Sequence, residues 1–73
     1  MIKKTNKALK RLGHKVQKLR KRTKTSQEEM ATQLGISRVY MGYIEQGREG
    51  PSLRLLMKIA RKFKIKIEEL FHR

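Results

Sequence analysis

Apolar residues recur at helical spacing in five stretches of this chain, and short polar turns separate them. The first stretch predicts a helix over roughly residues 4–22, because apolar positions three and four apart fall on one face of a helix. Its stripe consists of Leu9, Leu12, Val16 and Leu19. Gly13 interrupts this helix and lowers its propensity by about 1 kcal/mol. No segment alternates apolar and polar residues long enough to predict a strand, so we expect an all-α fold.

Two shorter helices are predicted over roughly residues 27–34 and 38–46, and they meet at Gly35. Gly35 suits the left-handed conformation that often ends a helix. The expected inner positions of this pair are Met30, Ala31, Leu34, Ile36, Met41 and Ile44. Residues 26–47 therefore have the pattern of a helix-turn-helix, whose second helix enters the major groove of DNA.

Serines precede three of the predicted helices. Ser26 and Glu29 have the spacing of a capping box, in which each side chain satisfies a free backbone N–H. Ser37 and Ser52 are placed to cap the next two helices. These caps agree with the helix starts that the apolar pattern indicates.

The last two stretches complete the predicted fold. A fourth helix follows residue 52, with expected inner positions Leu53, Leu56, Ile59, Ala60 and Phe63. Lys64 takes the place of a helix-ending glycine, and a short fifth helix covers Ile67–Phe71 with Leu70 inward. The exposed apolar candidates for a dimer contact are Leu55, Ile67 and Phe71. We predict a compact five-helix bundle that forms one domain over residues 1–73, with residues 1–8 as a frayed basic N-terminus.

Charge points to a polyanionic partner. The formal net charge is +14 on 73 residues, and residues 1–27 contain no Asp or Glu. Such a field attracts phosphate and speeds association with nucleic acid. The alternative is a solvated surface that carries no function. Binding to a membrane surface is disfavoured, because the apolar face of the first helix is narrow and has no aromatic residue.

Other chemistry is not indicated. The chain has no cysteine, which fits a reducing cytosol, and no run of residues long enough to span a bilayer. We expect a cytoplasmic, nucleoid-associated protein of bacterial or phage type, without a membrane partner. His14 and His72 are isolated, so neither a metal site nor a cofactor is predicted. The serines serve as caps, and we expect a protein that is not an enzyme.

Four separated blocks carry a family resemblance. They are SQEEMA at 26–31, LGIS at 34–37, YIEQG at 43–47, and PSL at 51–53 with Leu56, Lys58, Ile59 and Ala60. Through these blocks the chain resembles the Xre-type helix-turn-helix family, which includes phage repressor and Cro proteins. The resemblance covers roughly residues 13–71 and implies a repressor-like DNA-binding domain.

The resemblance implies a set of base-contacting residues in the third helix. Arg38, Val39 and Tyr43 match the usual positions, and Tyr40 and Gln46 are secondary candidates. Arg38 can bind guanine through O6 and N7, and Val39 can meet a thymine methyl group. Many relatives carry glutamine at the first two of these positions, so no operator sequence can be transferred. The alternative for both tyrosines is packing against neighbouring helices, and we favour it more for Tyr40.

The same resemblance implies phosphate contacts and one structural ion pair. Gln27 matches the phosphate-binding glutamine of the family, although it could also be an ordinary exposed residue. The other phosphate candidates are Arg48, Lys24, Thr25 and Ser37. Arg20 and Glu45 match a salt bridge that ties the first helix to the third, which removes Arg20 from the list of DNA contacts.

Together these expectations describe a sequence-specific regulator of transcription that binds double-stranded DNA. We predict a repressor or autoregulator that acts as a homodimer on a near-palindromic operator, with half-sites about one helical turn apart. Residues 37–41 have a short likeness to controllers of restriction–modification loci. The alternative is an antitoxin-type interaction module that binds a toxin as well as DNA. Coating of nucleic acid without sequence preference is disfavoured, because the outer face of the third helix carries little charge.

Overall fold

The computed structural model describes residues 7–72 and shows four α-helices and one 3₁₀ helix. The elements are α1 (Lys7–Arg22), α2 (Gln27–Leu34), α3 (Arg38–Gln46), α4 (Leu53–Phe63) and the 3₁₀ helix η1 (Ile67–Phe71). No strand occurs within residues 7–72, so the all-α class is confirmed for this part of the chain.

The predicted count of five helices is not confirmed, because the last element is a 3₁₀ helix. Five residues are too few to form a stable α-helix, and single tight turns of this length commonly adopt the 3₁₀ form. The predicted start of the first helix at residue 4 and most of the predicted frayed segment 1–8 lie outside the described residues.

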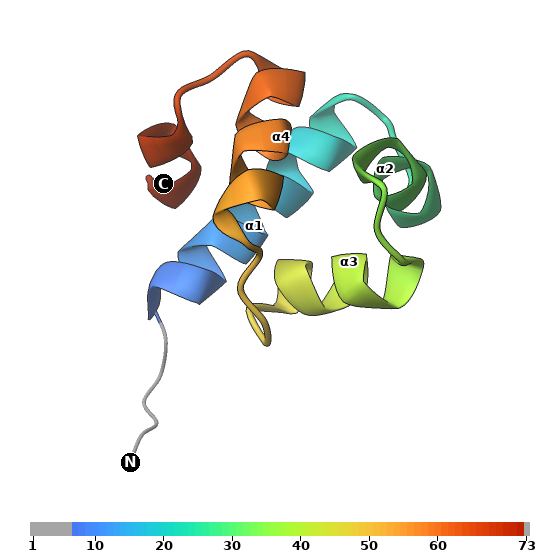
Figure 1. Cartoon of the computed structure of the whole chain (residues 1–73), viewed down its shortest axis with the longest axis horizontal. Helices are drawn as coiled ribbons and strands as arrows, with labels where there is room; N and C mark the ends of the chain where they lie inside the picture. The colour runs from blue at the N-terminus through green and yellow to red at the C-terminus, as the bar shows by residue number, and fades with distance from the viewer. Residues whose placement is uncertain (1–6, 73) are drawn as a thin grey trace.

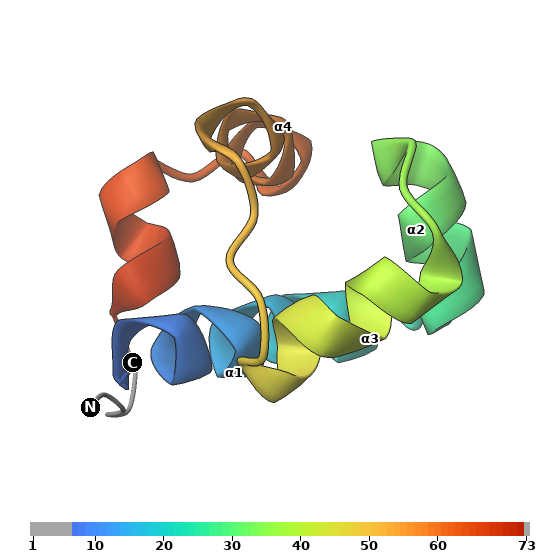
Figure 2. The same ribbon diagram turned by 60° about the horizontal axis from the view of Figure 1, so that its bottom comes forward.

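The elements surround one small core (Figures 1 and 2). Helices α1 and α3 lie side by side, and α2 stands at one end of this pair. Helix α4 lies on the other side of the core from α1, and η1 packs against α1 at its N-terminal end. This arrangement leaves one long side of α3 facing away from the bundle. No helix of the described chain has the length and apolar character needed to cross a membrane.

The core draws residues from all five elements. Its buried members are Leu12, Val16, Leu19, Met30, Ala31, Leu34, Met41, Ile44, Leu55, Ile59, Ala60 and Leu70. Two predictions about α4 were wrong, since Leu53 is 66% exposed and Leu55 is only 6% exposed. Leu55 and Ile59 lie one helical turn apart on the buried side, which turns Leu53 and Met57 to the opposite side. Ile67 and Phe71 are partly buried against the core rather than exposed.

Gly13 explains how α1 and α3 come so close. A Cβ atom at this position would lie 2.3 Å from the carbonyl oxygen of Ile44 and 2.6 Å from that of Glu45. No side chain fits in that space, so the residue that weakens α1 by propensity is the one that permits its contact with α3.

The helix ends follow the predicted caps. The capping box of Ser26 and Glu29 is present, and the side chains of Ser37 and Ser52 cap α3 and α4. Gly35 ends α2 with φ of 74°, in the left-handed region, as predicted. Lys64 adopts φ of 57° at the end of α4, so it makes the same turn without the freedom of glycine.

Candidate nucleic-acid interface

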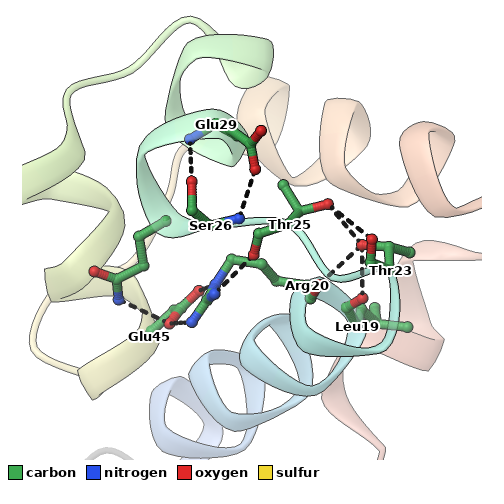
Figure 3. A network of polar contacts seen from close by, with 8 residues as sticks. Leu19, Arg20, Thr23, Thr25, Ser26, Glu29 and Glu45 are labelled. Atoms are coloured by element: carbon green, nitrogen blue, oxygen red, sulfur yellow. Dashed lines mark hydrogen bonds and ion pairs between the residues drawn. The ribbon is translucent and has the colours of Figure 1, made fainter.

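A buried ion pair holds the inner side of α3 (Figure 3). Nε of Arg20 donates to Oε2 of Glu45 at 2.6 Å, and Nη2 donates to Oε1 at 3.0 Å. Each residue is 8% exposed. The remaining Nη1 of Arg20 donates to the carbonyl oxygen of Thr25 at 2.9 Å. The structure therefore brings together the two residues that the sequence suggested as a pair, and it uses Arg20 internally.

Arg20 keeps its positive charge in this pair. The hydrogen bond with Glu45 raises the pKa of Arg20 above its ordinary value, burial opposes this effect, and the charge of Glu45 adds to it. Arg20 is thus positively charged at any pH at which the protein would operate. A charged, two-point contact of this kind restricts both the distance and the rotation between α1 and α3.

Gln27 joins the same network. Its Nε2 donates to Oε1 of Glu45 at 2.9 Å, so Glu45 accepts hydrogen bonds from both α1 and α2. An amide nitrogen carries two N–H groups, and one of them is still available for a phosphate. This contact was not predicted from the sequence, because the spacing of Gln27 does not indicate which partner its side chain meets.

The outer side of α3 is open. Arg38 and Gln46 are exposed, and Val39 is 56% exposed. None of these three side chains forms a hydrogen bond or ion pair with another residue of the described chain. Gly42 is buried, yet the only neighbouring atom that an added Cβ would meet is Nε2 of Gln46 at 4.0 Å. A methyl group would therefore fit at Gly42.

The two tyrosines of α3 differ. Tyr40 is partly buried against the core, and its hydroxyl donates to the carbonyl oxygen of Gly50 at 3.3 Å, which fits the packing alternative. Tyr43 is partly buried as well, but Arg48 lies over its ring, with Cζ 4.5 Å from the ring centroid. The sequence suggested separate roles for Tyr43 and Arg48, whereas the structure stacks one upon the other.

The remaining phosphate candidates lie at helix boundaries. Lys24 is exposed and has φ of 57° in the turn between α1 and α2. The hydroxyl of Thr25 lies 2.9 Å from that of Thr23. The hydroxyl oxygen of Ser37 accepts from the backbone N–H of Tyr40 at 3.0 Å, which leaves its proton free to donate. No group of three or more His, Cys, Asp or Glu side chains that could hold a metal ion occurs within residues 7–72.

Comparison with known proteins decides the family. The sequence model of the helix-turn-helix family matches residues 16–70, from the middle of α1 through most of η1. The chain belongs to the Xre-type helix-turn-helix family. It is accordingly a DNA-binding regulator of transcription.

Individual members of the helix-turn-helix family are similar over most of their length. An uncharacterized HTH-type transcriptional regulator of Archaeoglobus fulgidus is 40% identical over 57 residues, which is 78% of this chain and 81% of the relative. The control protein C.MunI of a Mycoplasma species is 44% identical over 62 residues, which is 84% of each chain. The crystal structure of the restriction-modification controller protein C.AhdI from Aeromonas hydrophila matches with a TM-score of 0.77 and 35% identity, covering 86% of this chain and 96% of that one.

Proposed function

We propose that this protein is a sequence-specific repressor or autoregulator that reads double-stranded DNA with the outer side of α3. The observation that carries the proposal is the contrast between the two sides of this helix. Its inner side is held by Arg20 and Gln27 through Glu45, and its outer side presents unbonded side chains. A helix that is positioned rigidly and open on one side is suited to the major groove.

The proposed base contacts come from three exposed positions. Arg38 donates to O6 and N7 of a guanine, Val39 contacts a thymine methyl group, and Gln46 binds a base edge near the end of the helix. Tyr43 contributes its hydroxyl or ring edge, because Arg48 covers one face of the ring. We assign Tyr40 to positioning, since its hydroxyl already donates within the protein.

The proposed phosphate contacts flank this surface. The free N–H of the Gln27 amide and the first backbone N–H groups of α2 donate to a phosphate oxygen. Arg48, Lys24, Thr25 and Ser37 supply further contacts from the loops. These contacts position the protein on the duplex and add affinity that does not depend on sequence.

We further propose that two copies bind a near-palindromic operator. Leu53 and Met57, exposed by 66% and 44%, provide an apolar surface on α4 that a second copy could cover. The two copies would then place their α3 helices in two successive turns of the major groove, one helix in each turn.

The second candidate function is an antitoxin-type module. The observation that favours it is the same exposed pair on α4, because an apolar contact outside α3 would also suit a toxin. Coexpression with the product of an adjacent reading frame separates the two cases. Loss of toxicity together with a stable complex would support the antitoxin.

Selection of binding sites from a random duplex library at about 150 mM salt tests the main proposal, because weak charge-driven binding is suppressed there. We expect enrichment of an inverted repeat. Binding without any enriched sequence, which vanishes as salt rises, would contradict sequence reading by α3.

A further inference from the structure

One side of α1 carries a line of cations that the proposed site does not use. We call it the α1 ridge, and it consists of Lys7, Arg11, Lys15, Lys18 and Arg22. These residues are spaced four, four, three and four apart, so they share one side of the helix. All of them are exposed except Lys15, which is partly buried.

The α1 ridge faces away from α3. Gly13 marks the side of α1 that abuts the carbonyl groups of Ile44 and Glu45. At about 100° per residue, Arg11 and Lys15 lie about 200° around the helix from Gly13, on the opposite side. Since α3 lies against α1 and the proposed DNA surface is the far side of α3, a duplex bound there does not reach the ridge.

The cations of the ridge have no acidic partner at ion-pair distance within the described chain. Within residues 7–72, none of the ridge cations forms an ion pair, and the single recorded ion pair joins Arg20 to Glu45. A shallow hollow of about 280 Å³ runs along the ridge. It is lined by Lys10, Arg11, His14, Lys15, Lys18 and His72, without any Asp or Glu. The local field is therefore positive around this hollow, which has no acidic residue in its lining.

The spacing of the ridge suits a nucleic-acid strand. From Lys7 to Arg22 the helix rises about 22 Å, with successive cations about 4.5 to 6 Å apart. A strand of duplex DNA carries one phosphate per about 3.4 Å of axis but winds around that axis, so a straight ridge of this length faces only part of a run of about six phosphates. The ridge has no exposed apolar residue, which disfavours insertion into a lipid surface.

We infer that the α1 ridge binds the phosphate backbone of a second nucleic-acid duplex, without sequence preference, while α3 holds the first. One protein molecule would then bridge two DNA segments. The inference rests on the proposed function only for the first duplex.

The test uses two variants of equal charge. Changing Arg11, Lys15 and Lys18 to Gln lowers the net charge from +14 to +11 at the ridge. Changing Lys62, Lys64 and Lys66 to Gln makes the same reduction around the end of α4. All of these positions are exposed or partly exposed. Thermal melting of both variants checks that each is folded.

The assay immobilises a duplex that contains the selected site, loads it with protein, and measures retention of a fluorescent duplex that lacks the site. We expect the wild type and the α4 variant to retain this second duplex within twofold of each other. The ridge variant should retain at least about tenfold less, and its salt slope should fall by up to about 2.7, because three phosphate contacts are lost.

Three outcomes would overturn the inference. In the first, the wild type retains no second duplex. In the second, both variants lose retention equally, and in the third, neither variant loses it. Equal loss in both variants would show that retention of the second duplex depends on net charge alone. No loss in either variant would show that the second α3 helix of a dimer retains it. Failure of the proposed function is distinguishable, because it would appear as loss of preference for the immobilised site itself.

Discussion

The two sides of α3 are built in opposite ways within nine residues. On the inner side Met41 and Ile44 are almost fully buried, and the carboxylate of Glu45 accepts hydrogen bonds from two other helices. On the outer side Arg38 and Val39 are exposed and form no side-chain hydrogen bond within the described chain. The inner side therefore fixes the position of α3, and the outer side is left free for the proposed contact with DNA. Substitutions on the inner side should change stability, and those on the outer side should change DNA binding.

The largest effect is expected from Glu45→Ala. This change leaves Arg20 buried without its carboxylate, and it should lower the free energy of unfolding by about 3–5 kcal/mol. Thermal or urea unfolding measures the loss. The matched control is Glu49→Ala, an exposed glutamate in the next loop, which should stay within about 0.5 kcal/mol of the wild type. Equal stability of the two variants would contradict a stabilising role for the ion pair of Arg20 and Glu45.

Gly13→Ala should destabilise the protein by about 1–3 kcal/mol or more, because the added methyl group overlaps two backbone carbonyls of α3. Gly42→Ala is its counterpart on α3, where a methyl group fits and helix propensity improves by up to about 1 kcal/mol. Urea unfolding of both variants checks the pair. Destabilisation of similar size at the two positions would contradict the close contact at Gly13.

Arg38→Ala should leave stability unchanged within about 0.5 kcal/mol and weaken binding to the best site by about 1–3 kcal/mol. The reason is loss of a guanine contact without loss of any internal contact. Fluorescence anisotropy on the selected site and on a scrambled duplex measures this difference. Arg54→Ala, which removes the same charge from α4, is the control and should weaken both duplexes slightly and equally.

The smallest effect is expected from Gln27→Ala, which should change both stability and DNA binding. Loss of the hydrogen bond to Glu45 should lower stability by about 1 kcal/mol, and loss of the phosphate contact should weaken binding to every sequence by a similar factor. Parallel unfolding and anisotropy measurements report both. A variant that discriminated less between the selected site and a scrambled duplex would show that Gln27 reads sequence.

Much of the fold follows from local rules that act within a few residues. The caps at Ser26, Ser37 and Ser52 and the turn at Gly35 depend on neighbouring backbone atoms, so spacing alone predicts them. The motif core was therefore well defined in the sequence.

The errors arose where several registers satisfy the same pattern. The start of α4 contains four apolar residues, and helical spacing allows either side of that segment to be buried. They are Leu53, Leu55, Leu56 and Met57. Packing against the rest of the core buries Leu55 and leaves Leu53 exposed. The residues next to them in sequence do not determine which of the two is buried.

The candidate site shows the same division. The proposed base-contacting positions come from the motif. The hydrogen bond of Gln27 to Glu45 and the stacking of Arg48 on Tyr43 depend on side-chain conformations across the fold. The spacing of residues in the sequence does not predict such contacts, because they depend on how two separate elements pack against each other.

The most direct test of the central claim is to repeat the site selection with Arg38→Ala beside the wild type. The account predicts that the variant enriches the same inverted repeat but loses preference at one base pair of each half-site. An unchanged consensus at every position would contradict direct readout by the outer side of α3.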